Sequence, residues 1–152
     1  MKFKDFKVGQ EFAVTTTLTE SDFHNYISFA RTRNILHENP EIAKKEGITG
    51  IMLPGRSIIA RAEGEMTRLS EFADCIMLLY GMDGDPNWQG RQTRYLGEVY
   101  AGDELNIRYI VSDKKEDRGY GILAVDYEIS RSRDGKLVAV SRRNLYRIKQ
   151  TS

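Results

Sequence analysis

The sequence predicts a single α+β domain in which a long helix packs on a curved antiparallel sheet. Three observations predict it. A strand-like segment opens the chain, helical periodicity follows in the middle, and the second half contains successive strands joined by turns. With 152 residues the chain has the length of one domain, spanning 1–152. No Pro-, Gly- or Ser-rich linker divides it.

The first half contains one predicted strand and three predicted helices. Residues 10–18 are rich in Val, Thr and Phe, which favours a strand. Thr19 or Ser21 can cap a helix that ends near residue 31, because apolar side chains recur there at helical spacing. A polar stretch over 31–39 separates this helix from a short one over 40–46, and a longer helix is expected from about 56 to 70.

The second half is predicted to be β. Segment 72–85 permits two interpretations, an extension of the long helix or a strand. Turns are expected at 101–103 and at the Arg-Asp-Gly sequence 133–135, which is a hairpin signal. The strand candidates are 88–99, 104–113, 120–131 and 136–148.

Composition excludes several classes of partner and site. A net charge of +1 gives no reason to expect nucleic acid as a partner. No stretch approaches the roughly 20 apolar residues of a membrane span, and the N-terminus lacks the apolar segment of a signal peptide, so we expect a cytoplasmic protein. The single cysteine, Cys75, is expected to be a buried thiol. Without Cys/His spacing for zinc, the sequence predicts no metal site and no cofactor.

Residues 29–43, FARTRNILHENPEIA, resemble the signature of the MaoC-like (R)-specific enoyl-CoA hydratases and dehydratases. That pattern runs roughly Gly-Asp-x-Asn-Pro-x-His, followed by a spacer and Pro-x-x-Ala. Asn34, His37, Pro40 and Ala43 match it without gaps. Three further blocks resemble the family in the same order, at 7–19, 47–55 and 95–105.

The resemblance implies a hot-dog fold, in which a curved antiparallel sheet wraps around a central helix. Members of the family form dimers, so we expect a homodimer or a higher homo-oligomer. The implied substrate is an acyl thioester of CoA or of acyl-carrier protein, bound in a tunnel at the dimer interface. The implied activity is that of a lyase that adds water to an enoyl thioester or removes it from a 3-hydroxyacyl thioester.

The resemblance also assigns roles to individual residues. His37 is the expected acid or base, since the pKa of an imidazole lies near the working pH. The backbone N–H of Gly55, at the start of the long helix, can stabilise the thioester oxyanion, and the positive end of the helix reinforces this. Asn34 can orient the loop. The expected substrate-binding residues are Glu38, Arg56 and Ile59.

One departure from the signature leaves the chemistry open. Thr32 occupies the position of the family's Asp, five residues before His37, and a hydroxyl cannot act as a carboxylate base at neutral pH. The carboxylates that could replace it are Glu38, Glu63, Glu65 and Asp22. Simpler interpretations compete: ion pairs with Arg61 or Arg68 for the helix glutamates, and helix capping for Asp22.

Two alternative functions therefore stand beside the hydratase. The loss of the Asp at Thr32 also fits a non-catalytic acyl-binding partner subunit, because some family pairs keep the dyad in one chain only. A hot-dog thioesterase, or another biosynthetic enzyme, would use a different carboxylate such as Glu63 or Glu65. The fold alone does not decide between them, since one fold can support many different functions.

Overall fold

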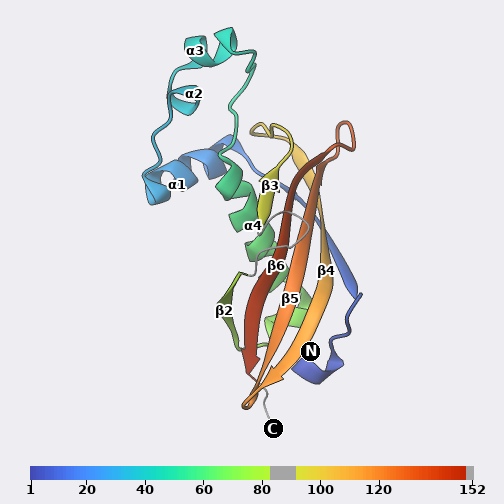
Figure 1. The fold of residues 1–152 in the computed structure, drawn as a ribbon. Helices are drawn as coiled ribbons and strands as arrows, with labels where there is room; N and C mark the ends of the chain where they lie inside the picture. The colour runs from blue at the N-terminus through green and yellow to red at the C-terminus, as the bar shows by residue number, and fades with distance from the viewer. Residues whose placement is uncertain (83–91, 150–152) are drawn as a thin grey trace.

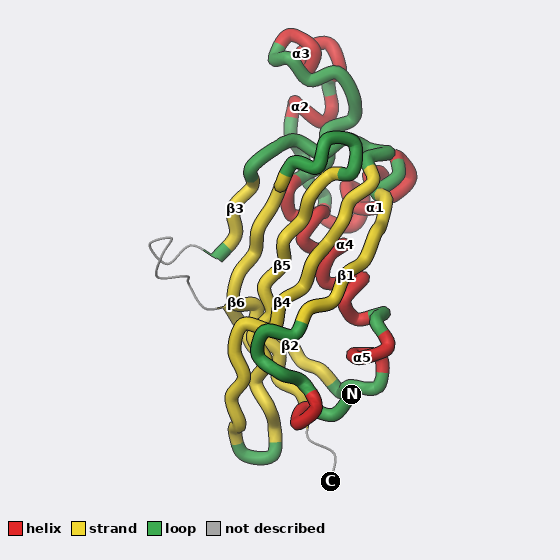
Figure 2. Tube along the Cα trace, turned by 90° about the vertical axis from the view of Figure 1, so that its right-hand side faces the viewer, coloured by secondary structure: helices red, strands yellow, loops and turns green. Residues whose placement is uncertain are grey.

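The computed structural model describes residues 1–82 and 92–149. Within them, one antiparallel sheet runs in the order β1-β4-β5-β6-β2, and β3 pairs with β6 beside β2 (Figure 1). The strands are β1 (Glu11–Thr17), β2 (Met77–Met82), β3 (Thr93–Tyr95), β4 (Glu104–Asp117), β5 (Tyr120–Arg131) and β6 (Leu137–Lys149). The expected architecture is present, because this sheet curves along one side of a helix (Figure 2).

The helices divide between the body of the fold and an arm. They are η1 (Phe3–Asp5), α1 (Glu20–Ala30), α2 (Ile35–Glu38), α3 (Pro40–Lys45), α4 (Gly55–Thr67) and α5 (Ser70–Ala73). Helix α4 lies along the inner face of the sheet, while α2 and α3 project beyond its end (Figure 1). We call residues 31–50, which carry α2 and α3, the arm. None of the helices in the described ranges has the length and hydropathy of a membrane span.

The core lies between α4 and the sheet. Ile58, Ala62 and Met66 recur at helical spacing on α4, and each is at most 3% exposed. They pack with alternating residues from the inner faces of β4, β5 and β6. Tyr109 of β4 also donates a hydrogen bond of 2.6 Å to the carbonyl of Ala62. This burial fixes which side of α4 faces the sheet, and therefore where its first turn points.

The central helix is shorter than the sequence predicted. The expectation of a helix over about 56–70 is wrong at its C-terminal end, since α4 stops at Thr67 and α5 begins at Ser70. Leu69 between them has extended backbone with ψ 140°. The break turns the chain so that Phe72 reaches the core. The centroid of its ring lies 5.0 Å from the centroid of the Phe6 ring.

The arm contains a helix that the sequence analysis did not predict. The polar stretch 31–39 includes α2, a single turn in which the Asn34 side chain accepts a hydrogen bond from the Leu36 amide. Asn39 caps α3 in the same way, by accepting hydrogen bonds from the amides of Glu41 and Ile42 at 3.1 Å. Arg31 ends α1 with left-handed backbone, φ 57°, and thereby turns the chain into the arm.

The observed strands confirm most of the strands that were predicted for the second half of the chain. Of the two interpretations of 72–85, the strand is the observed one over 77–82, and 83–85 lies outside the described residues. The candidate 88–99 is a strand only at 93–95, with 88–91 again outside the described residues. β4 extends four residues beyond the expected 104–113 because it continues to pair with β5 as far as a tight turn at Arg118-Gly119.

Candidate active site

Local hydrogen bonds on the arm position His37. The carbonyl of Asn34 accepts hydrogen bonds from the amides of His37 at 2.9 Å and Glu38 at 3.1 Å. The Asn34 side chain accepts from the amide of Leu36 at 3.0 Å. Asn34 therefore sets the turn that carries His37.

The imidazole of His37 borders a largely apolar cleft of about 410 Å³ between α2, α3 and the loop over 48–51 that follows them. Its Nδ1 atom is buried and has no hydrogen-bond partner in the described part of the chain. Its ring centroid lies 6.2 Å from that of Phe23 on α1. The residues lining this cleft, here called the His37 cleft, are Leu36, His37, Pro40, Ala43, Lys44, Ile48, Thr49, Gly50 and Ile51.

Gly55 begins α4 at the edge of a second cleft of about 450 Å³. The residue before it, Pro54, has no side-chain group that could cap the helix, so the first-turn amides receive no cap from the N-cap side chain. Amides at the positive end of a helix are suited to an oxygen that carries negative charge. The residues lining this cleft, here called the Gly55 cleft, are Met52, Leu53, Gly55, Arg56, Ile58, Tyr95, Gly97, Glu98 and Val99.

The two clefts are neighbours but do not merge within one chain. Ile51 lines the His37 cleft and Met52 lines the Gly55 cleft, so consecutive residues of one segment border both. Arg56 is exposed at the Gly55 cleft, whereas Ile59 is half-buried on α4 and lines neither cleft. Thr32 is half-buried at the start of the arm.

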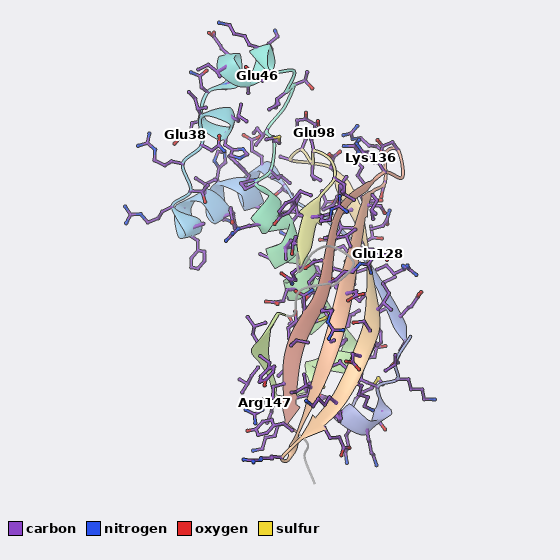
Figure 3. All side chains as sticks on the ribbon, in the orientation of Figure 1. Glu38, Glu46, Glu98, Glu128, Lys136 and Arg147 are labelled. Atoms are coloured by element: carbon purple, nitrogen blue, oxygen red, sulfur yellow. The ribbon has the colours of Figure 1, made fainter. Side chains whose placement is uncertain are left out.

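None of the candidate replacement carboxylates contacts His37 among the described residues. Glu38 pairs instead with Arg33 at 3.1 Å, on the arm beyond the sheet (Figure 3). Asp22 caps α1 as expected: hydrogen bonding from the Thr19 amide lowers the pKa of its carboxyl. The carboxylates of Asp22 and Glu65 also lie 2.9 Å and 4.0 Å from the guanidinium of Arg61.

Glu63 has a partner that the sequence analysis missed. It does not pair with Arg61 or Arg68 as expected but accepts a hydrogen bond of 2.6 Å from the hydroxyl of Tyr146. That hydroxyl is also hydrogen-bonded to Tyr127, and burial raises the pKa of both phenols, so both stay protonated. No local sequence pattern reveals this series of hydrogen bonds, since it depends on the register of β5 and β6 beneath α4.

Replacing Tyr146 with phenylalanine should lower the free energy of unfolding by about 1–3 kcal/mol. The change leaves a half-buried carboxylate and the buried Tyr127 hydroxyl without their shared partner. Chemical denaturation would measure the change. An unchanged denaturation midpoint for Tyr146→Phe would show that this hydroxyl does not stabilise Glu63.

Comparisons with known proteins show which solved structures have a similar fold. No protein-family model matches the sequence, and a search of curated proteins found no match. The structure resembles a monoamine oxidase regulatory protein of Archaeoglobus fulgidus, with a TM-score of 0.79 and 21% identity over 100% of this chain and 96% of that one. It also resembles the (R)-hydratase of A. caviae that is involved in PHA biosynthesis, with a TM-score of 0.68 and 16% identity over 98% and 99%.

A third similar structure is the HadBC complex of Mycobacterium tuberculosis, a 3R-hydroxyacyl-ACP dehydratase, with a TM-score of 0.70 and 14% identity over 95% of this chain and 96% of that one. The chain has the hot-dog fold. The fold class expected from the sequence is therefore confirmed, and it is shared with MaoC-like dehydratases and (R)-hydratases. The described residues contain no group of His, Cys, Asp and Glu side chains that could hold a metal ion.

Proposed function

We propose that this protein is a MaoC-like hydratase or dehydratase, a lyase that acts on an enoyl or 3-hydroxyacyl thioester. The observation that carries the proposal is the buried Nδ1 of His37, which has no partner in the described part of the chain and lies beside an apolar cleft. A buried nitrogen without a hydrogen bond is costly, so such a position is typical of a group that bonds a ligand or its water. The hydratases among the similar structures support the same reaction class.

The proposed reaction assigns one step to each end of the site. His37 takes a proton from water while the water oxygen bonds to the β-carbon of the enoyl thioester. The negative charge that forms on the thioester oxygen is stabilised by the first-turn amides of α4 at Gly55. The proton then returns from His37 to the α-carbon, which gives the 3-hydroxyacyl thioester. With Thr32 in place of a second acid–base group, His37 serves both transfers, and we expect slower turnover than a dyad gives.

The proposal includes an assembly, because neither cleft alone joins His37 to Gly55. A homodimer or higher homo-oligomer completes the tunnel between them. Strand β2 lies at the edge of the sheet and exposes Leu78, Leu79 and Tyr80 by more than half of their surface. An apolar edge strand is suited to pairing with a second copy. The substrate in this proposal is carried by CoA or acyl-carrier protein, and the protein acts in the cytoplasm.

A second candidate, a non-catalytic partner subunit, is favoured by a different observation. The four candidate carboxylates have other partners within the described ranges: Arg33 for Glu38, Arg61 for Asp22 and Glu65, and Tyr146 for Glu63. In that case a different chain supplies the acid–base pair, and this chain contributes the tunnel wall. A thioesterase that uses Glu63 is less favoured, because the Tyr146 hydroxyl already donates a hydrogen bond to that carboxylate.

The test is an assay of the purified protein with crotonyl-CoA and with enoyl-CoAs of longer chain. Loss of the absorbance of the conjugated thioester measures hydration, and release of free thiol measures hydrolysis in the same samples. The proposal expects hydration by the chain alone. Absence of hydration across the panel contradicts it. Activity that appears only when a co-purifying second chain is added identifies the partner subunit instead, and thiol release identifies the thioesterase.

A further inference from the structure

The aromatic ring of Tyr95 lies directly against the first residue of α4. A Cβ built on Gly55 would meet the Cε1, Cδ1 and Cζ atoms of Tyr95 at 2.7, 2.8 and 2.9 Å. Real Cβ atoms do not approach other atoms this closely. The space between the Tyr95 ring and the Gly55 backbone therefore does not hold even one methyl group.

Strand pairing keeps this ring in place. Tyr95 ends β3 and pairs with Ala139 of β6, and the next amide, that of Leu96, donates to the Val138 carbonyl at 2.8 Å. The Thr93 hydroxyl lies 3.0 Å from that of Ser141, which is fully buried. Tyr95 is thus held on a strand that pairs with β6, and this pairing fixes the backbone from which the ring reaches Gly55.

The ring also borders the path to the amides. Tyr95 and Gly55 both line the Gly55 cleft, and Tyr95 is 48% exposed. A thioester whose oxygen reaches the first-turn amides has its α-carbon one bond from the carbonyl carbon. The Tyr95 ring fills the space beside Gly55, so a methyl branch that points from that α-carbon toward Gly55 has no room there.

We infer that Tyr95 is a specificity-determining residue that admits thioesters unbranched at the α-carbon and rejects α-methyl-branched ones. The inference rests on the proposed function, because it takes the α4 amides to be the site of the thioester carbonyl. It goes beyond that function by naming the substrate class. The ring, rather than the hydroxyl, carries the selection, since ring carbons make the close approach to Gly55.

The kinetic test compares crotonyl-CoA with 2-methylcrotonyl-CoA in the full-length protein and its variants. The wild type is expected to favour the unbranched thioester by about 10–200-fold in kcat/KM, the range for one methylene at a fitted wall. Tyr95→Ala should reduce this preference by at least about tenfold. Tyr95→Phe keeps the ring and should leave the preference unchanged. If circular dichroism and thermal unfolding show that the alanine variant does not fold, Tyr95→Leu replaces it in the same comparison.

A binding measurement separates the inference from the proposed function. Isothermal titration calorimetry with butyryl-CoA and 2-methylbutyryl-CoA, which differ only in the α-methyl group, reports the same selection without turnover. Hydration of crotonyl-CoA together with equal binding of the two saturated thioesters overturns the inference and leaves the proposed function standing. Selective binding that Tyr95→Ala abolishes, without hydration of any enoyl thioester, supports the inference and contradicts the proposed function. A protein that neither binds nor hydrates these thioesters overturns both.

Discussion

Replacing His37 with alanine is expected to lower kcat/KM for enoyl-thioester hydration by about 10²–10⁴-fold, the usual contribution of a positioned acid–base group. The loss should be near the upper end of that range, because Thr32 supplies no carboxylate to share the proton transfers. Stability should change little, since the imidazole is half-exposed at the His37 cleft and its Nδ1 has no partner to lose in the described part of the chain. Hydration kinetics and thermal unfolding of the same preparation measure both effects.

The chain offers a matched control in its other histidine. His24 is exposed on α1, where its Nε2 atom lies 3.6 Å from the carboxylate of Glu20. An exposed ion pair of this kind contributes little, so His24→Ala should keep wild-type activity. His37→Gln fills a similar volume but cannot transfer a proton at neutral pH, and it should be as inactive as His37→Ala. Full activity in either His37 variant would remove His37 from the mechanism.

The parts of the fold that local pattern controls could be predicted from the sequence. Apolar spacing predicted α1 and the first three turns of α4, and the Arg-Asp-Gly sequence at 133–135 predicted the turn between β5 and β6. Helix α2 escaped prediction because it is a single turn within a polar stretch. The capping side chain of Asn34 was the signal that could have found it.

The site was only partly predictable, because its geometry depends on contacts between distant segments. The signature spacing predicted a role for His37 and the block at 47–55 a role for Gly55, and both residues line clefts, while their roles stay predictions. The Tyr146–Glu63 hydrogen bond and the approach of Tyr95 to Gly55 join residues 83 and 40 positions apart. Such pairs follow from strand register and helix placement, which no local pattern encodes.

Replacing Gly121 with alanine is expected to destabilise the fold by about 2–4 kcal/mol, the range between overpacking a core and losing a buried phenylalanine. Gly121 lies in β5, and a Cβ there would come within 2.1 Å of the Phe3 ring. That ring is 2% exposed, and the Lys114 ammonium sits 4.6 Å from its centroid. The added methyl must displace the N-terminal segment or distort the strand, and urea denaturation would measure the cost.

Two companion variants decide whether the clash with Phe3 is the cause. In a Phe3→Ala background the methyl group has room, so Gly121→Ala should cost less than about 1 kcal/mol there, a coupling typical of residues in direct contact. Gly64, an exposed glycine of α4, has nothing within 4 Å of its Cβ position. Gly64→Ala should instead stabilise the protein by about 0.5–1 kcal/mol, through helix propensity. A Gly121→Ala protein as stable as wild type, or equally destabilised with and without Phe3, would mean that η1 does not pack on β5 as described.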